Sequence, residues 1–475
     1  MTFTSLEFIL FLLVTLALYF SIRRENFRQY LLLAASSAFY GFWDTRFLLL
    51  LWGAIVVAFA AGRAIEHKPR YAREALWISI SSLLALLGVF KYFGFFTRSA
   101  YSLLTTMGLH ADGIFYSIVL PVGISFYIFQ AISYVIDVHR GVLPAEKNLM
   151  KVGLYISFFP QLVAGPIIRA ADFLPQLENQ PTFDTKRYLQ GLREITIGFI
   201  YKSVFADNLS KVVDPVFAEI ATYSNMDLIA ASIGFYGQIY FDFAGYSLMA
   251  IGVARLLGYD FPVNFAYPYR AFSVTDFWRR WHISLSGWLR DYLYISLGGN
   301  RRGTLRRYRN LMLTMLLGGL WHGASWAFVA WGGLHGLALV LHRIYTRGPI
   351  PHTLSSVPLW IRIAGSWALT QGFVLLCWIP FRLNDVSEAL EVLSAFGGLR
   401  HGPAISVLEG TWMLLLLPIL VDTFGMSSLD RGPIETSNNG FRYWPLVYCL
   451  VLGALFALAL ILIPLESAPF IYFQF

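Results

Sequence analysis

The segment GGLWHGASWAFVAWGGLHG, residues 318–336, lies inside an apolar run that extends from Leu311 to Leu341. This run is longer than the roughly 20 residues that cross a bilayer as an α-helix. Two histidines, His322 and His335, nevertheless lie within it. Polar side chains at membrane depth are costly and usually face a protein interior or a water-filled cavity. The segment therefore predicts a membrane-embedded helical structure that buries titratable groups.

The composition of the whole chain supports the same fold class. Of its 475 residues, 57% are hydrophobic and 13% are charged, whereas soluble proteins have about 25% charged residues. The sequence predicts an all-α polytopic membrane protein, in a single membrane-embedded domain over residues 1–475, surrounded by lipid and without a nucleic-acid partner. The main apolar runs cover residues 8–22, 47–62, 76–90, 115–135, 228–240, 311–341, 363–379, 412–421 and 444–463.

The first apolar run favours a retained helix over a secretory signal peptide. No lysine or arginine precedes residue 8, and three arginines follow the run. A signal peptide has its positive charge before the apolar stretch. We therefore expect residues 8–22 to remain as the first membrane helix.

Neither the cysteines nor the histidines form a metal-binding pattern. Cys377 and Cys449 both lie in apolar runs and are interpreted as small buried residues rather than as a disulfide or ligand pair. His322, His335 and His342 have no accompanying carboxylate cluster, as a metal centre would require. We expect no metal site.

Two apolar segments, 120–130 and 158–169, contain proline and glycine. These residues interrupt backbone pairing, which is tolerated at membrane depth only where protein or a water-filled cavity covers the freed groups. Broken or re-entrant helices around a cavity are therefore expected here.

The segment 277–303, FWRRWHISLSGWLRDYLYISLGGNRRG, has a different character. Helical spacing predicts one face that carries four large apolar side chains: Trp281, Leu285, Trp288 and Tyr292. Arginines elsewhere in the segment favour an amphipathic helix at the membrane interface. His282 and Ser286 lie off this face and are expected to point into the protein.

Five arginines occur within the nine residues of Arg301 to Arg309. A cluster of this kind ordinarily fixes a loop on the cytoplasmic side. A second, compatible interpretation is that the guanidinium groups attract a polyanionic donor, since arginine suits phosphate recognition.

His322 admits several interpretations. If Arg309 lies at the cytoplasmic interface, a helix to His322 is roughly 20 Å long, which places the imidazole deep in the bilayer. It is then either a buried histidine satisfied by one hydrogen bond or a catalytic group. A Ser-His-Asp hydrolase is disfavoured because no GxSxG motif occurs. A general base remains, because burial favours the neutral imidazole that accepts a proton from a hydroxyl.

The segments DFWRRWHISLSGWLRDYLYISLGGNR (276–301) and NLMLTMLLGGLWHGASW (310–326) strongly resemble the membrane-bound O-acyltransferases, or MBOAT family. The resemblance is closest to the bacterial branch typified by the membrane subunit of alginate O-acetylation. It continues through residues 120–141, 158–169 and 238–252 and reaches SAPFIYFQF at the end of the sequence. The family fold implied is a bundle of about 10–12 or more transmembrane, broken and re-entrant helices around a central tunnel.

The resemblance also implies roles for individual residues, within a catalytic core of about 115–345. The hallmark histidine of the family falls on His322, which would act at the acyl-transfer centre, and the second histidine of the bacterial branch falls on His282, which would line or orient the tunnel. Further candidates for the tunnel, for donor binding or for bracing are Trp278, Arg279, Arg280, Trp281, Asp291, Asn300, Arg306, Arg307, Trp321, Asp242 and Tyr246.

The sequence departs from the branch pattern FDFSGYSDMA, since residues 241–250 are FDFAGYSLMA. Ala244 removes a hydroxyl, and Leu248 removes a carboxylate. If that carboxylate helps to seat the acceptor or a partner, this chain serves a different glycan.

The resemblance predicts an O-acetyltransferase of the bacterial inner membrane that acts in O-acetylation of an exported, alginate-like polysaccharide. Its donor would be cytoplasmic acetyl-CoA or another acyl thioester, with no tightly bound cofactor. Extracytoplasmic acetyltransferase-type partner proteins would complete transfer to the polysaccharide. Alternatives are acylation of peptidoglycan, teichoic acid, cellulose, a lipid or a protein. Outside enzymes, a transporter of polysaccharide or acyl donor remains an alternative.

Overall fold

The computed structural model describes residues 1–109, 118–178, 184–301, 303–348, 356–400, 402–403, 444–464 and 468–471. Within these ranges the regular structure is helical and no strand occurs. Four of the described helical stretches are long and apolar enough to cross a membrane: Phe47–His67, Pro69–Thr106, Trp326–Arg347 and Leu359–Leu383. The predicted all-α polytopic fold class is confirmed, whereas the total number of membrane helices and the central tunnel stay predictions.

The chain divides into two compact units. One contains Met1–Gly191 and Ala250–Pro262, and the other contains Leu192–Met249 and Val263–Phe475. Each unit is described separately. The prediction of a single domain over residues 1–475 stays a prediction.

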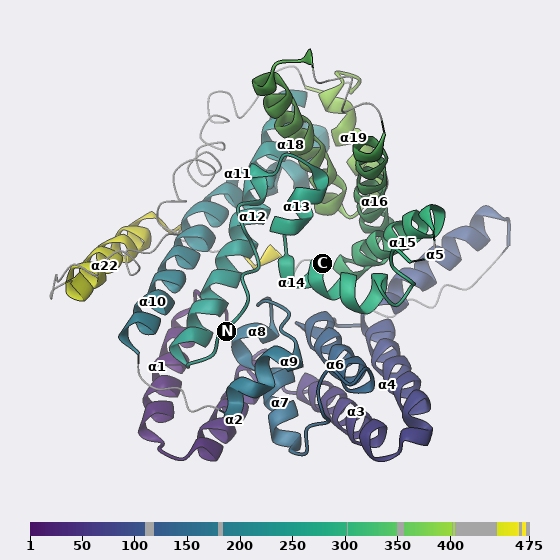
Figure 1. The fold of residues 1–475 in the computed structure, drawn as a ribbon. Coiled ribbons are helices and arrows are strands. Elements are labelled where there is room, and N and C mark those ends of the chain that lie inside the picture. The colour runs from purple at the N-terminus through teal and green to yellow at the C-terminus, as the bar shows by residue number, and fades with distance from the viewer. Residues whose placement is uncertain are drawn as a thin grey trace. The chain divides into compact units, whose positions relative to one another are not determined.

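The first unit is a helical bundle. Helices α3, α4 and α6 pack against one another, and α7 packs against α2 and α3 (Figure 1). A π-helical turn at Gly88–Tyr92 joins α4 to α5 into one long helical stretch. The bounds are α1 Leu6–Ser21, α2 Glu25–Gly41, α3 Phe47–His67, α4 Ala72–Leu87, α5 Phe93–Thr106, α6 Ile124–His139, α7 Leu149–Ser157, α8 Phe159–Leu162 and α9 Ala170–Phe173.

Segment 158–169 interrupts the helical structure of this unit, as predicted, whereas α6 begins within segment 120–130; the cavity expected around both segments stays a prediction. Gly123 has a φ of +72° directly before α6, and a Cβ there would collide with the Leu162 carbonyl oxygen. After α8 the backbone continues without regular structure to Arg169, although nearly all of these residues are buried. Non-helical backbone is therefore covered by protein, the condition under which it is tolerated at membrane depth.

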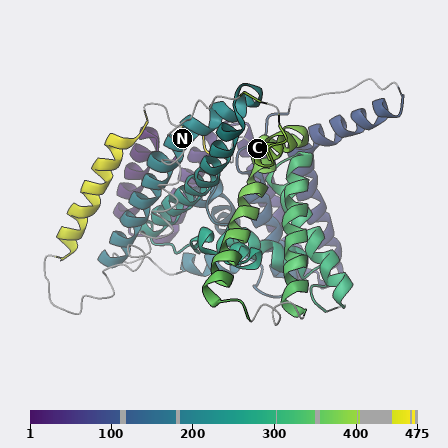
Figure 2. The ribbon, with the colours of Figure 1, turned by 90° about the horizontal axis from the view of Figure 1, so that it is seen from above.

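The second unit holds the remaining helices, and α10 and α12 run from one unit into the other. Figure 2 shows the green helices of this unit running side by side, in agreement with the packing of α16 against both α15 and α18. The bounds are α10 Thr185–Phe199, α11 Asp207–Ala218, α12 Asn225–Leu256, α13 Val274–Arg280, α14 Ile283–Trp288, α15 Thr304–His322, α16 Trp326–Arg347, α18 Leu359–Leu383, α19 Val386–Phe396 and α22 Trp444–Leu462.

Helices α15 and α16 form the closest pair of this unit. Their backbones approach at two glycines: a Cβ on Gly319 would collide with the Phe328 carbonyl oxygen, and one on Gly332 with that of Met315. Small residues allow such close approach between membrane helices, where association depends on van der Waals packing. The glycines of the 318–336 segment thus fix the hairpin that presents His322.

The two cysteines differ in their surroundings. Cys377 is buried in α18, as predicted, but Cys449 is exposed. The interpretation of Cys449 as a buried residue is wrong, because α22 presents most of its described side chains outward. An apolar run alone does not distinguish a lipid-facing side chain from a buried one.

Candidate active site

His322 is the last residue of α15, at a tight turn between two long helices. Gly323 ends α15 in an extended conformation, and a side chain there would collide with the Phe328 ring. Ser325 then caps α16 by accepting a hydrogen bond from the Phe328 N–H at 3.4 Å. The sequence WHGAS therefore ends one helix and begins the next, and it leaves His322 buried at the end of α15.

His282 lies at a break between two short helices, α13 and α14. Its backbone is left-handed, with φ 42° and ψ 58°, although it is not a glycine. Such a conformation is strained in most residues and often marks a functional position. The side chain is fully buried.

Asn264 fixes the orientation of the His282 ring. Its Oδ1 atom accepts hydrogen bonds from the Ser284 backbone N–H and hydroxyl and lies 3.0 Å from His282 Nδ1. A backbone N–H can only donate, so Oδ1 is an acceptor and His282 Nδ1 carries the proton. The His282 Nε2 atom is then left with a lone pair, and it is buried without a hydrogen-bond partner among the described residues.

The structure brings the two predicted catalytic histidines together. The ring centroids of His282 and His322 are 6.4 Å apart. Trp321 lies beside both, with centroid distances of 6.1 Å to His282 and 5.0 Å to His322. The two imidazoles and the Trp321 ring therefore belong to one buried cluster.

Aromatic rings from α16 and α18 complete the surroundings of His322. Trp331 lies 5.1 Å and Phe381 lies 5.3 Å from the His322 ring, measured between centroids. Trp378 stacks on Trp331 at 5.8 Å. These walls exclude water, so electrostatic interactions with a reacting group are stronger here than in solution.

A third buried histidine also contacts Trp331. His335 is fully buried, and its centroid is 4.9 Å from that of Trp331. Trp278 Nε1–H donates a hydrogen bond to His335 Nδ1 at 3.3 Å. Trp278, a predicted tunnel or donor-binding residue, is therefore hydrogen-bonded to His335. His335 was not among the predicted site residues.

The 277–303 segment is not a continuous interfacial helix. It breaks at His282, and all four side chains of its predicted apolar face are buried. Trp281 stacks on Phe277 at 5.6 Å and lies 4.8 Å from Trp378. The prediction of one amphipathic helix is wrong, because Asn264 stabilises the break at His282. The predicted face packs on other aromatic rings of the protein, among them Phe277 and Trp378 against Trp281.

Two of the three residues predicted to brace this segment form ion pairs. Arg280 forms an ion pair with Asp276 at 3.0 Å and donates to the Ala266 carbonyl. Asp291 pairs with Arg290 at 2.6 Å, which raises the pKa of Arg290. Arg279 is exposed.

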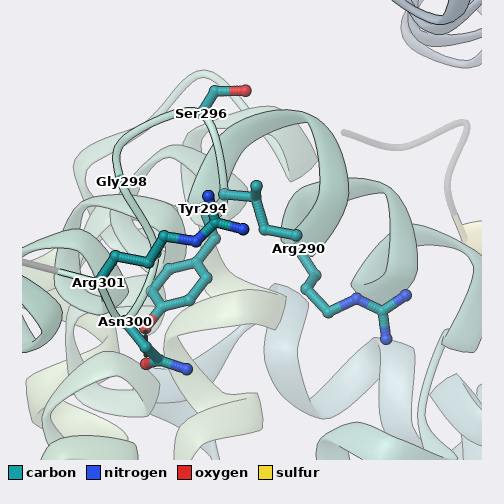
Figure 3. Close-up of a pocket in the computed structure, with 8 residues that line it drawn as sticks. Arg290, Tyr294, Ser296, Gly298, Asn300 and Arg301 are labelled. Carbon is teal, nitrogen blue, oxygen red and sulfur yellow. Dashed lines mark hydrogen bonds between the residues drawn. The ribbon is translucent and has the colours of Figure 1, made fainter. Parts of the chain in front are cut away.

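A pocket of about 500 Å³ lies where the segment ends (Figure 3). It is lined by Arg290, Tyr294 and Arg301 and by the 298–300 turn. Tyr294 points toward Asn300 and donates to its Oδ1 at 2.7 Å, whereas Arg290 reaches away from the turn (Figure 3). Of the predicted donor-binding residues, Asn300 is therefore the one placed on this pocket.

The arginines at the start of α15 differ in exposure. Arg306 is exposed, whereas Arg307 is buried and lies over the Tyr308 ring, 5.3 Å from its centroid. Arg302 lies outside the described residues. The two side chains predicted to bind the donor together therefore have different surroundings.

Asp242 and Tyr246, both on α12, lie beside a buried lysine and the segment 468–471, which we call the docked segment. Asp242 contacts Lys202 at 2.7 Å and accepts from the Ile471 N–H at 2.7 Å. The Tyr246 ring lies 4.5 Å from that of Phe470. Sequence reasoning missed Lys202, although a lysine within the apolar stretch IGFIYKSVF (197–205) is a visible signal.

Asn264 and His335 were also missed. Nothing near Asn264 in the sequence indicates that it contacts His282, because the contact depends on how the chain folds back between the two residues. Among the described residues, no group of three or more histidine, cysteine, aspartate or glutamate side chains is arranged to hold a metal ion.

Comparison with known proteins shows the family to which the chain is similar. Residues 140–349 match the model of MBOAT, the membrane-bound O-acyltransferase family. A probable alginate O-acetylase of Pseudomonas putida is 38% identical over 100% of both chains, and one of Pseudomonas aeruginosa is 39% identical over 92% of this chain and 84% of its own. A peptidoglycan O-acetyltransferase of Helicobacter pylori is 36% identical over 78% of this chain and 73% of its own.

Proposed function

The chain belongs to the membrane-bound O-acyltransferase family and is a multi-pass acyltransferase of the bacterial inner membrane, and from this premise we propose that it moves acetyl groups for O-acetylation of an exported polysaccharide. Its relatives include probable alginate O-acetylases that align over its full length. The transporter alternative is set aside, because the chain belongs to an acyltransferase family and these relatives are named as an O-acetylase and an O-acetyltransferase.

The proposal rests above all on one observation, the juxtaposition of His282 and His322 at 6.4 Å within buried aromatic walls. His322 is the general base. It accepts the proton of the acceptor hydroxyl as the oxygen bonds to the thioester carbonyl carbon. The carbon–sulfur bond then breaks, and the thiolate takes up the proton from His322. Positioned proton transfer of this kind contributes about 10² to 10⁴ in rate.

His282 orients the reacting group. Its Nδ1–H is held by Asn264, and its Nε2 lone pair accepts a hydrogen bond from a hydroxyl or an N–H of the substrate. An acceptor oriented in this way approaches His322 in a defined geometry, which lowers the entropic part of the barrier.

The donor is a cytoplasmic acyl thioester, of which acetyl-CoA is the simplest. Its phosphates meet the arginine-rich beginning of α15, and its thioester reaches the histidines at the other end of that helix. From Thr304 to His322 this helix is roughly 27 Å long at 1.5 Å per residue.

The acceptor is reached through an extracytoplasmic partner of acetyltransferase type. Within the described ranges both units are built from helices, and these ranges contain no separate soluble domain. Peptidoglycan is the second acceptor to consider, because the Helicobacter pylori relative carries that name.

Deletion of the gene for this chain tests the proposal directly. Exported polysaccharide and peptidoglycan from deletion and complemented cells are compared for O-acetyl content by NMR. We expect acetylation of the exported polysaccharide to disappear on deletion and to return on complementation. Loss confined to peptidoglycan would make peptidoglycan the acceptor, and unchanged acetylation of both would contradict the proposal.

A further inference from the structure

The second unit contains a buried lysine whose charge is surrounded by two carboxylates. Lys202 is 4% exposed, and its Nζ atom lies 2.8 Å from Asp207 Oδ1 and 2.7 Å from Asp242 Oδ1. Buried ion pairs contribute little to stability compared with well-packed apolar side chains. Ionisable groups inside membrane proteins usually mark a functional site. We therefore expect this cluster to have a role other than stabilising the fold.

The backbone at this point is built to bring Lys202 against α12. Residues Ile200–Ala206 form a π-helical turn, a feature that is frequent at functional sites. Gly245 of α12 lies very close to this turn. A Cβ on Gly245 would be 2.6 Å from the Gly198 carbonyl oxygen and 2.7 Å from the backbone nitrogen of Lys202. The two glycines thus allow the close contact that places Lys202 beside Asp242, one turn away on α12.

The lysine and its partner hold the backbone of the docked segment, residues 468–471, at two points. Lys202 Nζ donates to the Ala468 carbonyl at 3.0 Å, and Asp242 Oδ2 accepts from the Ile471 N–H at 2.7 Å. Between these two points the Phe470 ring is buried, with 1% of its surface exposed. Charge-assisted hydrogen bonds of this kind are roughly twice as strong as neutral ones.

The docked segment reaches His282 through one phenylalanine. The Phe470 ring lies 6.0 Å from Phe243, and the Phe243 ring meets the His282 ring edge-on at 4.7 Å. Asn264 fixes His282 at Nδ1, whereas Phe243 limits the movement of the ring itself. Without the docked segment, the Phe243 ring loses one of its neighbours and can turn away from His282.

We propose that Lys202 is a positioning residue of the acyl-transfer site, which acts by holding residues 468–471 against Phe243 and thereby fixing the His282 ring. This role for Lys202 rests on the proposed function, in which His282 orients the reacting group. It adds that the site is complete only when the docked segment is in place. Lys202 and Asp242 touch no reacting atom in this scheme.

A cysteine at position 471 reports docking, because the Ile471 side chain is 2% exposed and its backbone N–H is retained in Ile471→Cys. The exposed Cys449 is replaced by serine, and Cys377 is left because it is buried. Labelling by a membrane-permeant maleimide and acyl-transfer kinetics are then measured in Lys202→Met and in Lys211→Met. Lys211 is an exposed lysine of α11 and is the matched control.

We expect Lys202→Met to speed labelling of the cysteine and to lower kcat by roughly 10- to 100-fold, because a misplacement of about 1 Å can cost 10² in rate. The KM for acetyl-CoA stays within about twofold, since no donor contact is lost. Lys211→Met changes neither quantity. Unchanged labelling in Lys202→Met, or faster labelling at unchanged kcat, would overturn the proposal.

A second pair of variants tests docking from the segment side, should Lys202→Met not fold. Ile471→Pro removes the N–H that Asp242 binds, whereas Ile471→Val keeps it, and both variants retain Lys202 and its two carboxylates. A fall in kcat in Ile471→Pro but not in Ile471→Val is expected, and equal kcat in both would overturn the proposal. A wild-type chain that is inactive even with an extracytoplasmic partner present would contradict the proposed function alone, since the labelling experiment still decides whether Lys202 holds the segment.

Discussion

The imidazole rings of His282 and His322 lie 6.4 Å apart, although His322 ends a long helix and His282 lies in the break between two short ones. Each ring is placed by a different local device. A glycine turn ends α15 at His322, and Asn264 holds His282 in its left-handed backbone conformation. Two independent devices that converge on one buried point favour a reaction centre over incidental packing.

Replacement of His322 by alanine should lower kcat by about 10² to 10⁴, the range expected for loss of a general base. Acetyl transfer from labelled acetyl-CoA is measured in membranes that contain equal amounts of folded protein. His342→Gln is the matched control, because His342 lies on the neighbouring helix and contacts Thr275 rather than the site. A His322→Ala protein with near wild-type kcat would remove His322 from the mechanism.

Replacement of Asn264 by leucine should lower kcat by roughly 2- to 10-fold. The expected loss corresponds to one hydrogen bond of about 0.5–1.5 kcal/mol that no longer fixes the proton on His282 Nδ1. Ser247→Ala is the control, because Ser247 contacts the other end of the Asn264 amide at 3.0 Å and not His282. Equal losses in both variants would indicate a packing role for Asn264 instead.

Alanine at Gly319 or Gly332 should destabilise the protein by about 1–3 kcal/mol, the usual cost of overpacking. A Cβ at either position would collide with backbone of the facing helix, which cannot yield as a side chain can. The thermal midpoint of each variant in detergent is compared with that of Gly365→Ala, where no atom lies within 4 Å of the new Cβ. Unchanged midpoints at Gly319 and Gly332 would mean that the two helices are farther apart than described.

The structure also divides the roles of the two arginines at the start of α15. Arg306→Gln should raise the KM for acetyl-CoA with little change in kcat, because the exposed guanidinium attracts donor phosphates over a range of about 10 Å. Arg307→Gln should instead reduce the yield of folded protein, since Arg307 is buried. Steady-state kinetics at two salt concentrations separate these outcomes. An Arg306 effect that does not weaken with salt would contradict electrostatic steering.

The sequence was sufficient to predict the helical membrane fold and the interruption at residues 158–169, and its resemblance to the family pointed to His282 and His322, which the structure brings together. These features depend on composition, on proline and glycine, and on local motifs. It was not sufficient for the break at His282, which Asn264 stabilises from a distant part of the chain, or for the burial of Trp288 and Tyr292. Helical spacing identifies a shared face, but only tertiary contacts decide whether that face meets lipid or protein.

For the ion cluster at Lys202, too, the sequence shows the residues but not their contacts. A lysine in an apolar stretch is visible in the sequence, and so is Asp242 in its motif. Their contact and its use in holding residues 468–471 depend on the close approach of Gly198 and Gly245. Sequence reasoning therefore finds the charged residues but not their partners, because pairing inside a membrane protein depends on three-dimensional packing.

The last prediction concerns transfer across the membrane. Purified chain in liposomes, supplied with acetyl-CoA on the arginine side and with polysaccharide, should leave the polysaccharide unmodified. A polymer hydroxyl would otherwise have to enter the buried, aromatic surroundings of His322. Each sugar hydroxyl stripped of water and left unpaired there costs roughly 1 to 3 kcal/mol.

A partner protein that offers one acceptor side chain, or a mobile shuttle, avoids this burial. Addition of an extracytoplasmic acetyltransferase-type partner to the same liposomes should therefore restore O-acetylation, and His322→Ala chain with the partner present is the control. O-acetyl groups on the polymer are measured by NMR, and release of free thiol from acetyl-CoA is followed in parallel. Robust acetylation of the polymer without the partner would refute the relay, because the chain would then be the complete transferase.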